Sequence, residues 1–223
     1  MKKTLLAFAL LSTIPTAVLA NQAGDILVRG GLTMVAPDTG KSSILLGGDD
    51  STMTLTVDDN TQLGLNLVYF FDSNWAIELL AATPFTHDVT IQDLSGVLGV
   101  DGAKLAEVSH LPPTLSALYY FDTGTALKPY VGVGLNYTIF FDEEFSDAAT
   151  GLGLSNLELD GSFGYSVQVG ADYHINNKWH VNASVRYIDI NSDALFDVAG
   201  DNIGSASIGV DPMVYSIMLG YKF

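Results

Sequence analysis

Few side chains of this chain have the types and spacing that a catalytic site requires. The 223 residues include four histidines and no cysteine. Hydrolysis needs a nucleophile and a base within hydrogen-bond reach. His180 and Ser184 share one face of an expected strand, but a rise of ~3.3 Å per residue puts them about 13 Å apart. Ser109 and His110 are adjacent, without an evident acid to orient the histidine. We therefore predict no catalytic residue and keep a lipid-modifying enzyme as an alternative.

A larger set of ionisable and phenolic side chains indicates pairing rather than catalysis. These residues occupy the faces of expected strands that lie opposite the large apolar side chains. They are Arg29, Glu78, Tyr120, Tyr130, Asp172, His174, His180 and Lys222. Because a buried charge must be paired, we predict that these side chains pair across the interior of a closed sheet and plug it near one end. The lengths of the connections, described below, place this end on the periplasmic side. A proton-sensitive gate that uses His174 or His180 is the alternative.

The last eleven residues, Met213–Phe223, show what kind of element positions these side chains. Every second residue there is large and apolar, and a period of two is typical of a strand with two unlike faces. At the edge of a soluble sheet such a strand would promote aggregation. We therefore expect it to pair with another strand and to face lipid.

Seven further segments alternate in the same way. With the last one, the expected strands are Ile26–Val35, Gln62–Phe70, Trp75–Ala82, Thr114–Phe121, Tyr130–Phe140, Phe163–His174, Trp179–Ile190 and Met213–Phe223. Ten residues at ~3.3 Å, tilted by ~40°, cover roughly 25 Å, the height of the apolar band on outer-membrane barrels. The predicted fold is all-β: an eight-stranded antiparallel transmembrane up-and-down β-barrel, in which the last strand closes on the first.

The connections between these strands alternate between short and long. The short ones are Phe71–Asn74, Asp122–Pro129 and Ile175–Lys178, and the long ones are Ala36–Thr61, Thr83–Pro113, Phe141–Ser162 and Asn191–Pro212. Barrels of this class have tight turns on the periplasmic side and long loops outside. We therefore expect both termini in the periplasm and four long loops at the outer surface.

Residues 1–20 have the pattern of a cleaved signal peptide, which leaves 21–223 as the barrel. Lys2 and Lys3 form its charged region, Leu5–Leu11 its apolar region, and Val18-Leu19-Ala20 an acceptable cleavage site. A transmembrane anchor is the competing interpretation, but the apolar stretch is short for it and Pro15 interrupts it. The leader and the expected barrel together predict export to the outer membrane of a Gram-negative bacterium.

Composition and charge favour the same class of protein. Hydrophobic residues make up 48% and charged residues 15%, and soluble domains have about a quarter of charged residues. Without Lys2 and Lys3 the formal charge of −16 becomes −18, which argues against nucleic acid as a partner. The long connections carry 19 acidic residues. We interpret them as a solvated surface. Weak divalent-cation bridging to lipopolysaccharide is the alternative, but no spacing predicts a defined metal or cofactor site.

Above the predicted plug, the inward positions of the expected strands become apolar. These positions are Val35, Ala82, Phe140, Ile188, Ile190 and Val214. A hydrophobic solute that enters such a cup from outside meets a blocked floor, so we expect it to leave sideways between strands. Pro112 and Pro113 mark a candidate lateral opening, because proline cannot donate to the ladder; alternatively, they only begin a strand.

Four motifs follow one another along the chain after the leader. They are Glu78-Leu79-Leu80-Ala81-Ala82-Thr83-Pro84-Phe85, His110-Leu111-Pro112-Pro113-Thr114, Pro129-Tyr130-Val131-Gly132-Val133-Gly134-Leu135-Asn136-Tyr137-Thr138 and Gly220-Tyr221-Lys222-Phe223. In these motifs the chain resembles the outer membrane protein W family. The resemblance implies an eight-stranded barrel whose proposed cargo is small hydrophobic molecules. It also implies an assembly signal for the barrel-assembly machinery, carried here by Tyr221 and Phe223.

Three functions remain open at this point. The apolar cup and the resemblance favour a passive conduit for small hydrophobic molecules. The long acidic loops are also compatible with a surface receptor or a structural, stress-related barrel, and the third possibility is the enzyme considered above. The expected partners are outer-membrane lipid and lipopolysaccharide, small hydrophobic solutes and the barrel-assembly machinery, with no cofactor.

Overall fold

The computed structural model describes residues 21–38, 43–46, 49–50, 53–93 and 101–223. Strands make up nearly all of this part of the chain, and its one helix is the short α1 (Asp147–Gly151). The predicted signal peptide, residues 1–20, lies outside the described residues.

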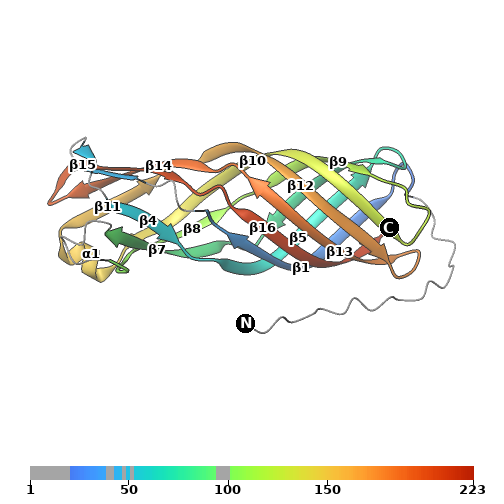
Figure 1. Cartoon of the computed structure of the whole chain (residues 1–223), viewed down its shortest axis with the longest axis horizontal. Coiled ribbons are helices and arrows are strands. Elements are labelled where there is room, and N and C mark those ends of the chain that lie inside the picture. Colours follow the sequence, from blue (N-terminus) through green and yellow to red (C-terminus); the bar gives the residue numbers. More distant parts are fainter. Residues whose placement is uncertain (1–20, 39–42, 47–48, 51–52, 94–100) are drawn as a thin grey trace, which may run out of the picture.

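Eight antiparallel strands close into a barrel. In sheet order they are β1 (Ile26–Ala36), β5 (Asn60–Phe70), β6 (Trp75–Ala82), β9 (Thr114–Tyr120), β10 (Leu127–Phe145), β12 (Ser162–His174), β13 (Trp179–Ile188) and β16 (Met213–Lys222). The ladder is continuous, because β10 pairs with β12 and β16 pairs with β1. The predicted eight-stranded fold is confirmed, and the strands run obliquely around one long axis (Figure 1).

The last strand closes on the first over its whole length. The register runs from Leu27 opposite Lys222 to Ala36 opposite Met213. Beyond β16, the backbone N–H of Phe223 still donates to the carbonyl of Ile26 at 2.9 Å. The start of β1 and the C-terminus therefore lie at the same end of the barrel, together with the short turns; we call this the turn end (Figure 1).

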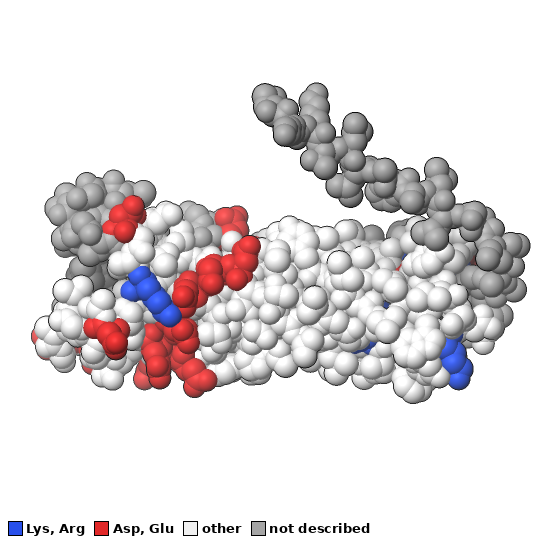
Figure 2. Space-filling view, turned by 90° about the horizontal axis from the view of Figure 1, so that it is seen from below, with Lys and Arg blue, Asp and Glu red and all other residues white. Residues whose placement is uncertain are grey.

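Alternating exposure along the strands explains why the sequence forms a barrel in lipid. Outward side chains such as Leu63 and Ile217 are 63% and 69% exposed, whereas the inward Leu27 is fully buried. On the face that Figure 2 shows, the outcome is a broad stretch without charged residues across the middle of the barrel. Aromatic pairs, including Trp75 with Tyr119 and Trp179 with Tyr221, gather at the turn end. Such a girdle is typical of a membrane interface.

The opposite end of the barrel differs from the sequence prediction. The four long connections, predicted as loops, contain strands that prolong the barrel. These are β2 (Ser43–Leu46), β3 (Asp49–Asp50), β4 (Met53–Val57), β7 (Phe85–Asp93), β8 (Lys104–Leu111), β11 (Leu154–Leu159), β14 (Asn191–Val198) and β15 (Asp201–Gly209). With α1 and the end of β10 they form the part of the molecule that we call the extension (Figure 1).

The extension is ordered because it has a core of its own. Strands β8, β7 and β4 continue the barrel sheet beyond β10, and β11, β14, β15, β2 and β3 form a second sheet. Alternating apolar residues from both sheets bury one another, namely Ile44, Leu55, Val89, Ala106, Val108, Ala194, Phe196 and Ala206. The sequences of these shorter strands also alternate with a period of two. They were predicted as loops because the eight longer strands were sufficient to span a bilayer. The acidic residues cluster on the outside of this end (Figure 2).

Deletion of Phe223 should reduce assembly of the barrel in the membrane. The ring is 72% exposed and packs edge-on against Tyr221 at 4.8 Å, so it contributes little to the interior. Loss of its single backbone hydrogen bond should cost folded stability only about 1 kcal/mol. We expect the membrane-inserted fraction of the truncated protein, measured by heat-modifiable electrophoretic mobility, to fall far more than its stability after refolding. The Phe223→Tyr variant, which keeps an aromatic end, is the control, and normal insertion of the truncated chain would contradict the expectation.

Candidate functional site

The middle of the barrel is blocked by buried ion pairs. Arg29 of β1 is fully buried, and its Nη1 donates to Oε2 of Glu78 at 3.0 Å. Its Nη2 donates to Oδ2 of Asp172 at 2.6 Å. The other oxygen of Glu78 pairs with Arg186 of β13. Two guanidinium groups and two carboxylates therefore offset one another inside the barrel, and we call these four residues the charged network.

Neutral polar side chains add hydrogen bonds to the two carboxylates of the charged network. Gln168 and Asn66 each donate to a carboxylate oxygen of Glu78 at 2.9 Å. Asn182 donates to Asp172 at 2.8 Å and to the hydroxyl of Tyr130 at 3.0 Å. Buried carboxylates with several donors each are well satisfied, so these groups hold the network in one arrangement.

The structure brings most of the predicted plug residues together. Tyr120 accepts a hydrogen bond from Arg29 and donates to Asp172 at 3.1 Å, and Nε2 of His180 accepts from Nε of Arg29 at 3.3 Å. His174 lies next to this group, with its ring 5.5 Å from that of His180.

Lys222 lies beyond the charged network, at the turn end, and it pairs there with a residue outside the predicted plug. Its Nζ pairs with Asp25 at 2.9 Å, at the turn end of the barrel. The neighbour that sequence reasoning overlooked is Asp25, which precedes β1 and reaches the end of β16. A pairing between the two chain ends becomes visible only once the barrel is closed.

Arg186 of the charged network and its neutral partners were absent from the predicted plug; these partners are Asn66, Gln168 and Asn182. The sequence did contain a signal for them, because the alternation of the strands places all four on the face opposite the large apolar side chains. Arg186 is also charged, which marks it as a residue that needs a partner inside the barrel. A cluster of apolar side chains on the turn-end side of the network was also unexpected. It contains Leu27, Val68, Phe70, Ala76 and Leu118, together with the rings of Tyr120 and Tyr130. Buried side chains therefore continue from the charged network toward the turn end.

On the other side of the network the interior is apolar. All six predicted cup residues lie there in one cluster: Val35, Ile188, Ile190 and Val214 are buried, with Ala82 and Phe140 packed against them. Phe85 of β7 and Val210 belong to the same cluster but were not predicted, because both lie in connections that were taken as loops.

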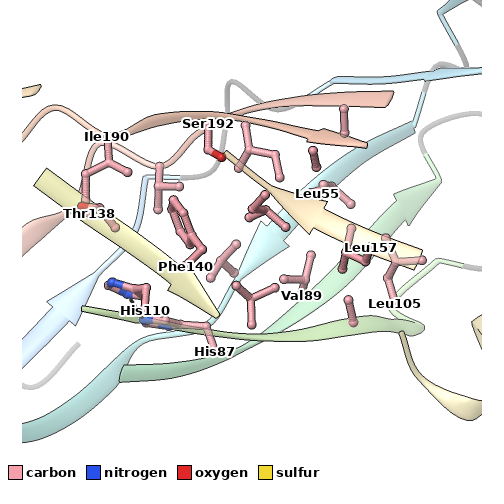
Figure 3. A pocket seen from close by; sticks show the side chains of 18 of the residues that line it. Leu55, His87, Val89, Leu105, His110, Thr138, Phe140, Leu157, Ile190 and Ser192 are labelled. Atoms are coloured by element: carbon pink, nitrogen blue, oxygen red, sulfur yellow. Dashed lines mark hydrogen bonds between the residues drawn. The ribbon is translucent and has the colours of Figure 1, made fainter. Parts of the chain in front are cut away.

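A cavity of about 80 Å³ lies between this apolar cluster and the core of the extension. Its wall combines barrel residues, such as Phe140, with extension residues, such as Leu55 and Val89 (Figure 3). Val35 of the barrel and Phe196 of the extension also line it. The few polar side chains in the wall are His87, His110, Thr138 and Ser192. An enclosure of this composition favours apolar matter over water.

A second, smaller cavity of about 10 Å³ lies in the barrel wall near Pro112. It is lined from inside by Val35, Ile188 and Val214, and by Ala81 of β6, whose side chain belongs to the exposed outer face. Pairing between β6 and β9 stops here, with Leu80 opposite Thr114 as the last pair. Val35 lines both cavities, so the two spaces are neighbours.

Two histidines of the extension face each other at the edge of the larger cavity. Nε2 of His87 and Nε2 of His110 are 3.1 Å apart, and the rings stack at 5.1 Å (Figure 3). Burial lowers the pKa of His87, although Asp58 and Asp59 partly oppose this effect. Burial, with a contribution from His87, lowers the pKa of His110 to about 3. Both rings are therefore neutral near pH 7.

The residues of the enzyme alternative are engaged in other contacts. The hydroxyl of Ser109 shares a hydrogen bond of 2.8 Å with that of Thr86, and the neighbouring His110 faces His87. His180 accepts its hydrogen bond from Arg29. None of these contacts has the nucleophile-to-base form that hydrolysis requires.

Comparison with known proteins identifies one family, and the match includes both the barrel and the extension. The model of the OmpW family matches residues 22–223. Outer membrane protein W of Vibrio cholerae serotype O1 is 43% identical over 225 residues, which cover 100% of both chains. Outer membrane protein W of Escherichia coli strain K12 is 40% identical over 225 residues, covering 100% of this chain and 99% of the relative. The crystal structure of the outer membrane protein OprG from Pseudomonas aeruginosa matches with a TM-score of 0.84 at 41% identity, covering 92% of this chain and 98% of OprG.

Replacement of Glu78 by leucine should destabilise the barrel by about 3–5 kcal/mol, because it leaves Arg186 buried without its carboxylate. The double variant Glu78→Leu, Arg186→Leu should recover part of this loss, since it removes the unpaired charge. The midpoint of urea unfolding in detergent micelles, followed by tryptophan fluorescence, measures both effects.

Lys104→Gln provides the comparison for that experiment. The Lys104 side chain is 41% exposed and pairs with Asp88 and Glu107 at the surface of the extension. Its replacement should cost less than about 1 kcal/mol. If the single Glu78 variant and the double variant were equally unstable, the ion pair between Glu78 and Arg186 would not be coupled as described.

Proposed function

Since the chain belongs to the OmpW family of outer-membrane β-barrels, we propose that it is a passive conduit for small hydrophobic molecules. The solute enters through the extension, occupies the apolar cavity above the charged network, and leaves sideways into the bilayer near Pro112. Residues 1–20 direct export, the turn end with both termini faces the periplasm, and the extension faces outward. Lipopolysaccharide and the barrel-assembly machinery are the partners that this placement implies.

The observation that carries the proposal is an apolar cavity above a closed, charged floor. A hydrophobic solute gains about 25 cal/mol per Å² of apolar surface that it removes from water. Passage through the floor would separate Arg29 from Glu78, and an unpaired buried charge costs about 3–5 kcal/mol. The axial route is therefore unfavourable for a passive solute, which supports exit through the wall.

A break in the strand pairing of the wall, between the last β6–β9 pair and the first β7–β8 pair, lies next to the smaller cavity. Beyond the last β6–β9 pair, Pro112 and Pro113 have no backbone N–H to donate. The facing residues of β6 are Ala81 and Ala82, whose small side chains leave the narrow cavity between lumen and outer surface. A solute can widen this place without breaking ladder hydrogen bonds, which supports the lateral exit.

Replacement of Ile188 or Val214 by arginine should reduce uptake of small hydrophobic compounds by whole cells at least several-fold. Both side chains are buried in the apolar cluster and line the smaller cavity, so a cation there would obstruct the path and repel an apolar solute. The initial uptake rate of a radiolabelled alkane, compared at equal amounts of folded barrel, measures the effect.

Leu195→Arg is the matched control, because Leu195 is an exposed residue of β14 in the extension. Its uptake rate should equal that of the unmodified protein. If Ile188→Arg and Val214→Arg fold normally and leave uptake unaffected, the lumen is not the route.

A reversible disulfide bond across the proposed exit should block transport. The β6–β9 register would next place Ala81 opposite Pro113, and the chain has no cysteine of its own. Oxidation of the Ala81→Cys, Pro113→Cys double variant should lower uptake, and a reductant should restore it. The Ile77→Cys, Ala117→Cys pair lies within the intact ladder and serves as the control. Equal uptake by the oxidised and reduced forms of the first pair would exclude exit at this place.

A further inference from the structure

The smaller cavity is too narrow for the exit that the proposed function requires. Its volume of about 10 Å³ is close to that of one water-sized probe, whereas the larger cavity holds about 80 Å³. A hydrocarbon in the larger cavity can therefore leave through this part of the wall only if a side chain between the two spaces moves aside.

Two side chains of the apolar cluster lie between the cavities. Val35 of β1 lines both of them. Phe85, the first residue of β7, lines the smaller cavity, and only 1% of the residue is exposed. Its ring stacks at 5.6 Å on the ring of His110, which lines the larger cavity (Figure 3). A solute that passes from one cavity to the other must therefore pass Val35 and Phe85.

These two side chains differ in how firmly their strands hold them. Val35 lies in a strand that is paired on both sides, opposite Val214 and Asn60, and its β-branched side chain has few rotamers. Phe85 follows Pro84 at the break in the strand pairing. Within the described residues it has a strand partner on one side only, His110 of β8. Phe85 is therefore the side chain that can move with the smaller change of backbone.

The remaining wall of the smaller cavity contains no comparable obstacle. On the side of β6 it consists of the small residues Ala81 and Ala82, and Pro112 contributes a rigid ring. The other lining residues are smaller than phenylalanine, and their backbones are hydrogen-bonded on both sides. They are Thr33, Leu80, Ile188 and Val214. Phe85 thus combines the largest side chain of this wall with the least restrained backbone.

We propose that Phe85 is the gate of the lateral exit, and that its ring determines how wide a hydrocarbon the conduit passes. The inference rests on the proposed function and names a residue that sets selectivity within it. A linear chain needs only a small displacement of the ring, because its cross-section is narrow. A cage-shaped hydrocarbon needs the whole space that the ring occupies, so the conduit passes it slowly.

A purely structural role for the ring makes a different prediction. Phe85 packs in the apolar cluster with Val35, Ile188 and Val214, so its truncation leaves a void and lowers stability in either case. A barrel that is merely less stable would admit narrow and wide solutes to the same extent. A gate instead changes the ratio of the two uptake rates.

The test compares n-decane with adamantane, two hydrocarbons that have the same number of carbon atoms but different widths. Initial uptake of each radiolabelled probe by whole cells is measured at equal amounts of folded barrel, determined by heat-modifiable mobility. We expect Phe85→Ala to raise the ratio of adamantane to decane uptake several-fold, and Phe85→Leu to raise it less. Phe85→Trp should lower the ratio below that of the unmodified protein.

A cysteine at this position allows the ring to be restored chemically. The chain has no cysteine of its own, so Phe85→Cys introduces a single thiol. This variant should show a raised ratio, as Phe85→Ala does. Benzyl methanethiosulfonate, which attaches an aromatic ring through a disulfide bond, should return the ratio to the unmodified value, and a reductant should raise it again.

Phe70→Ala is the matched control. Phe70 is a fully buried phenylalanine of the apolar cluster at the turn end, and it lines neither of the two cavities. Its truncation removes the same ring and leaves a void on the other side of the charged network. The ratio of adamantane to decane uptake should stay that of the unmodified protein.

The outcomes distinguish this inference from the proposed function. The gate is overturned if decane uptake depends on the protein but the ratio is unchanged in Phe85→Ala. It is also overturned if Phe70→Ala raises the ratio equally, or if the benzyl group on the cysteine variant has no effect. If decane enters equally well without the protein, the conduit fails and the gate fails with it. Should Phe85→Ala not fold, the leucine, tryptophan and cysteine variants decide in the same way.

Discussion

The closed backbone ladder is the constraint on which the rest of the molecule depends. Hydrocarbon offers no water to backbone N–H and C=O groups, so each strand must pair on both sides and β16 must close on β1. Closure with only eight strands leaves an interior about as wide as its side chains. Any polar group that points inward must therefore find its partner within that interior.

The charged network is the consequence of this narrow interior. Arg29 lies between Glu78 and Asp172, and Arg186 completes the balance of charge. The network and the apolar cluster at the turn end pack the interior with side chains. Both described cavities lie on the other side of the network, where the inward residues are apolar.

The extension turns the open end of the barrel into an enclosed site. Its strands bury Leu55, Val89 and Phe196 against one another and cover the cavity with apolar wall. They also introduce a polar chain in that wall, which runs from the carbonyl of Asp58 through His87 to His110. The extension thus supplies most of the wall of the larger cavity, and the membrane-spanning strands supply the rest.

The eight strands and their lipid-facing sides could be predicted from the sequence, because a period of two is a local property that bilayer length and lipid contact enforce. The same alternation predicted which side chains point inward. These are the polar ones, such as Arg29 and Glu78, and the apolar ones above them, such as Ile188 and Val214. The strands of the extension, the pairing of Lys222 with Asp25, and the meeting of His87 with His110 did not. Closure of the barrel brings Lys222 to Asp25. The other two depend on which strands of the extension pair and in which register, as β7 does with β8, and a period of two does not specify this.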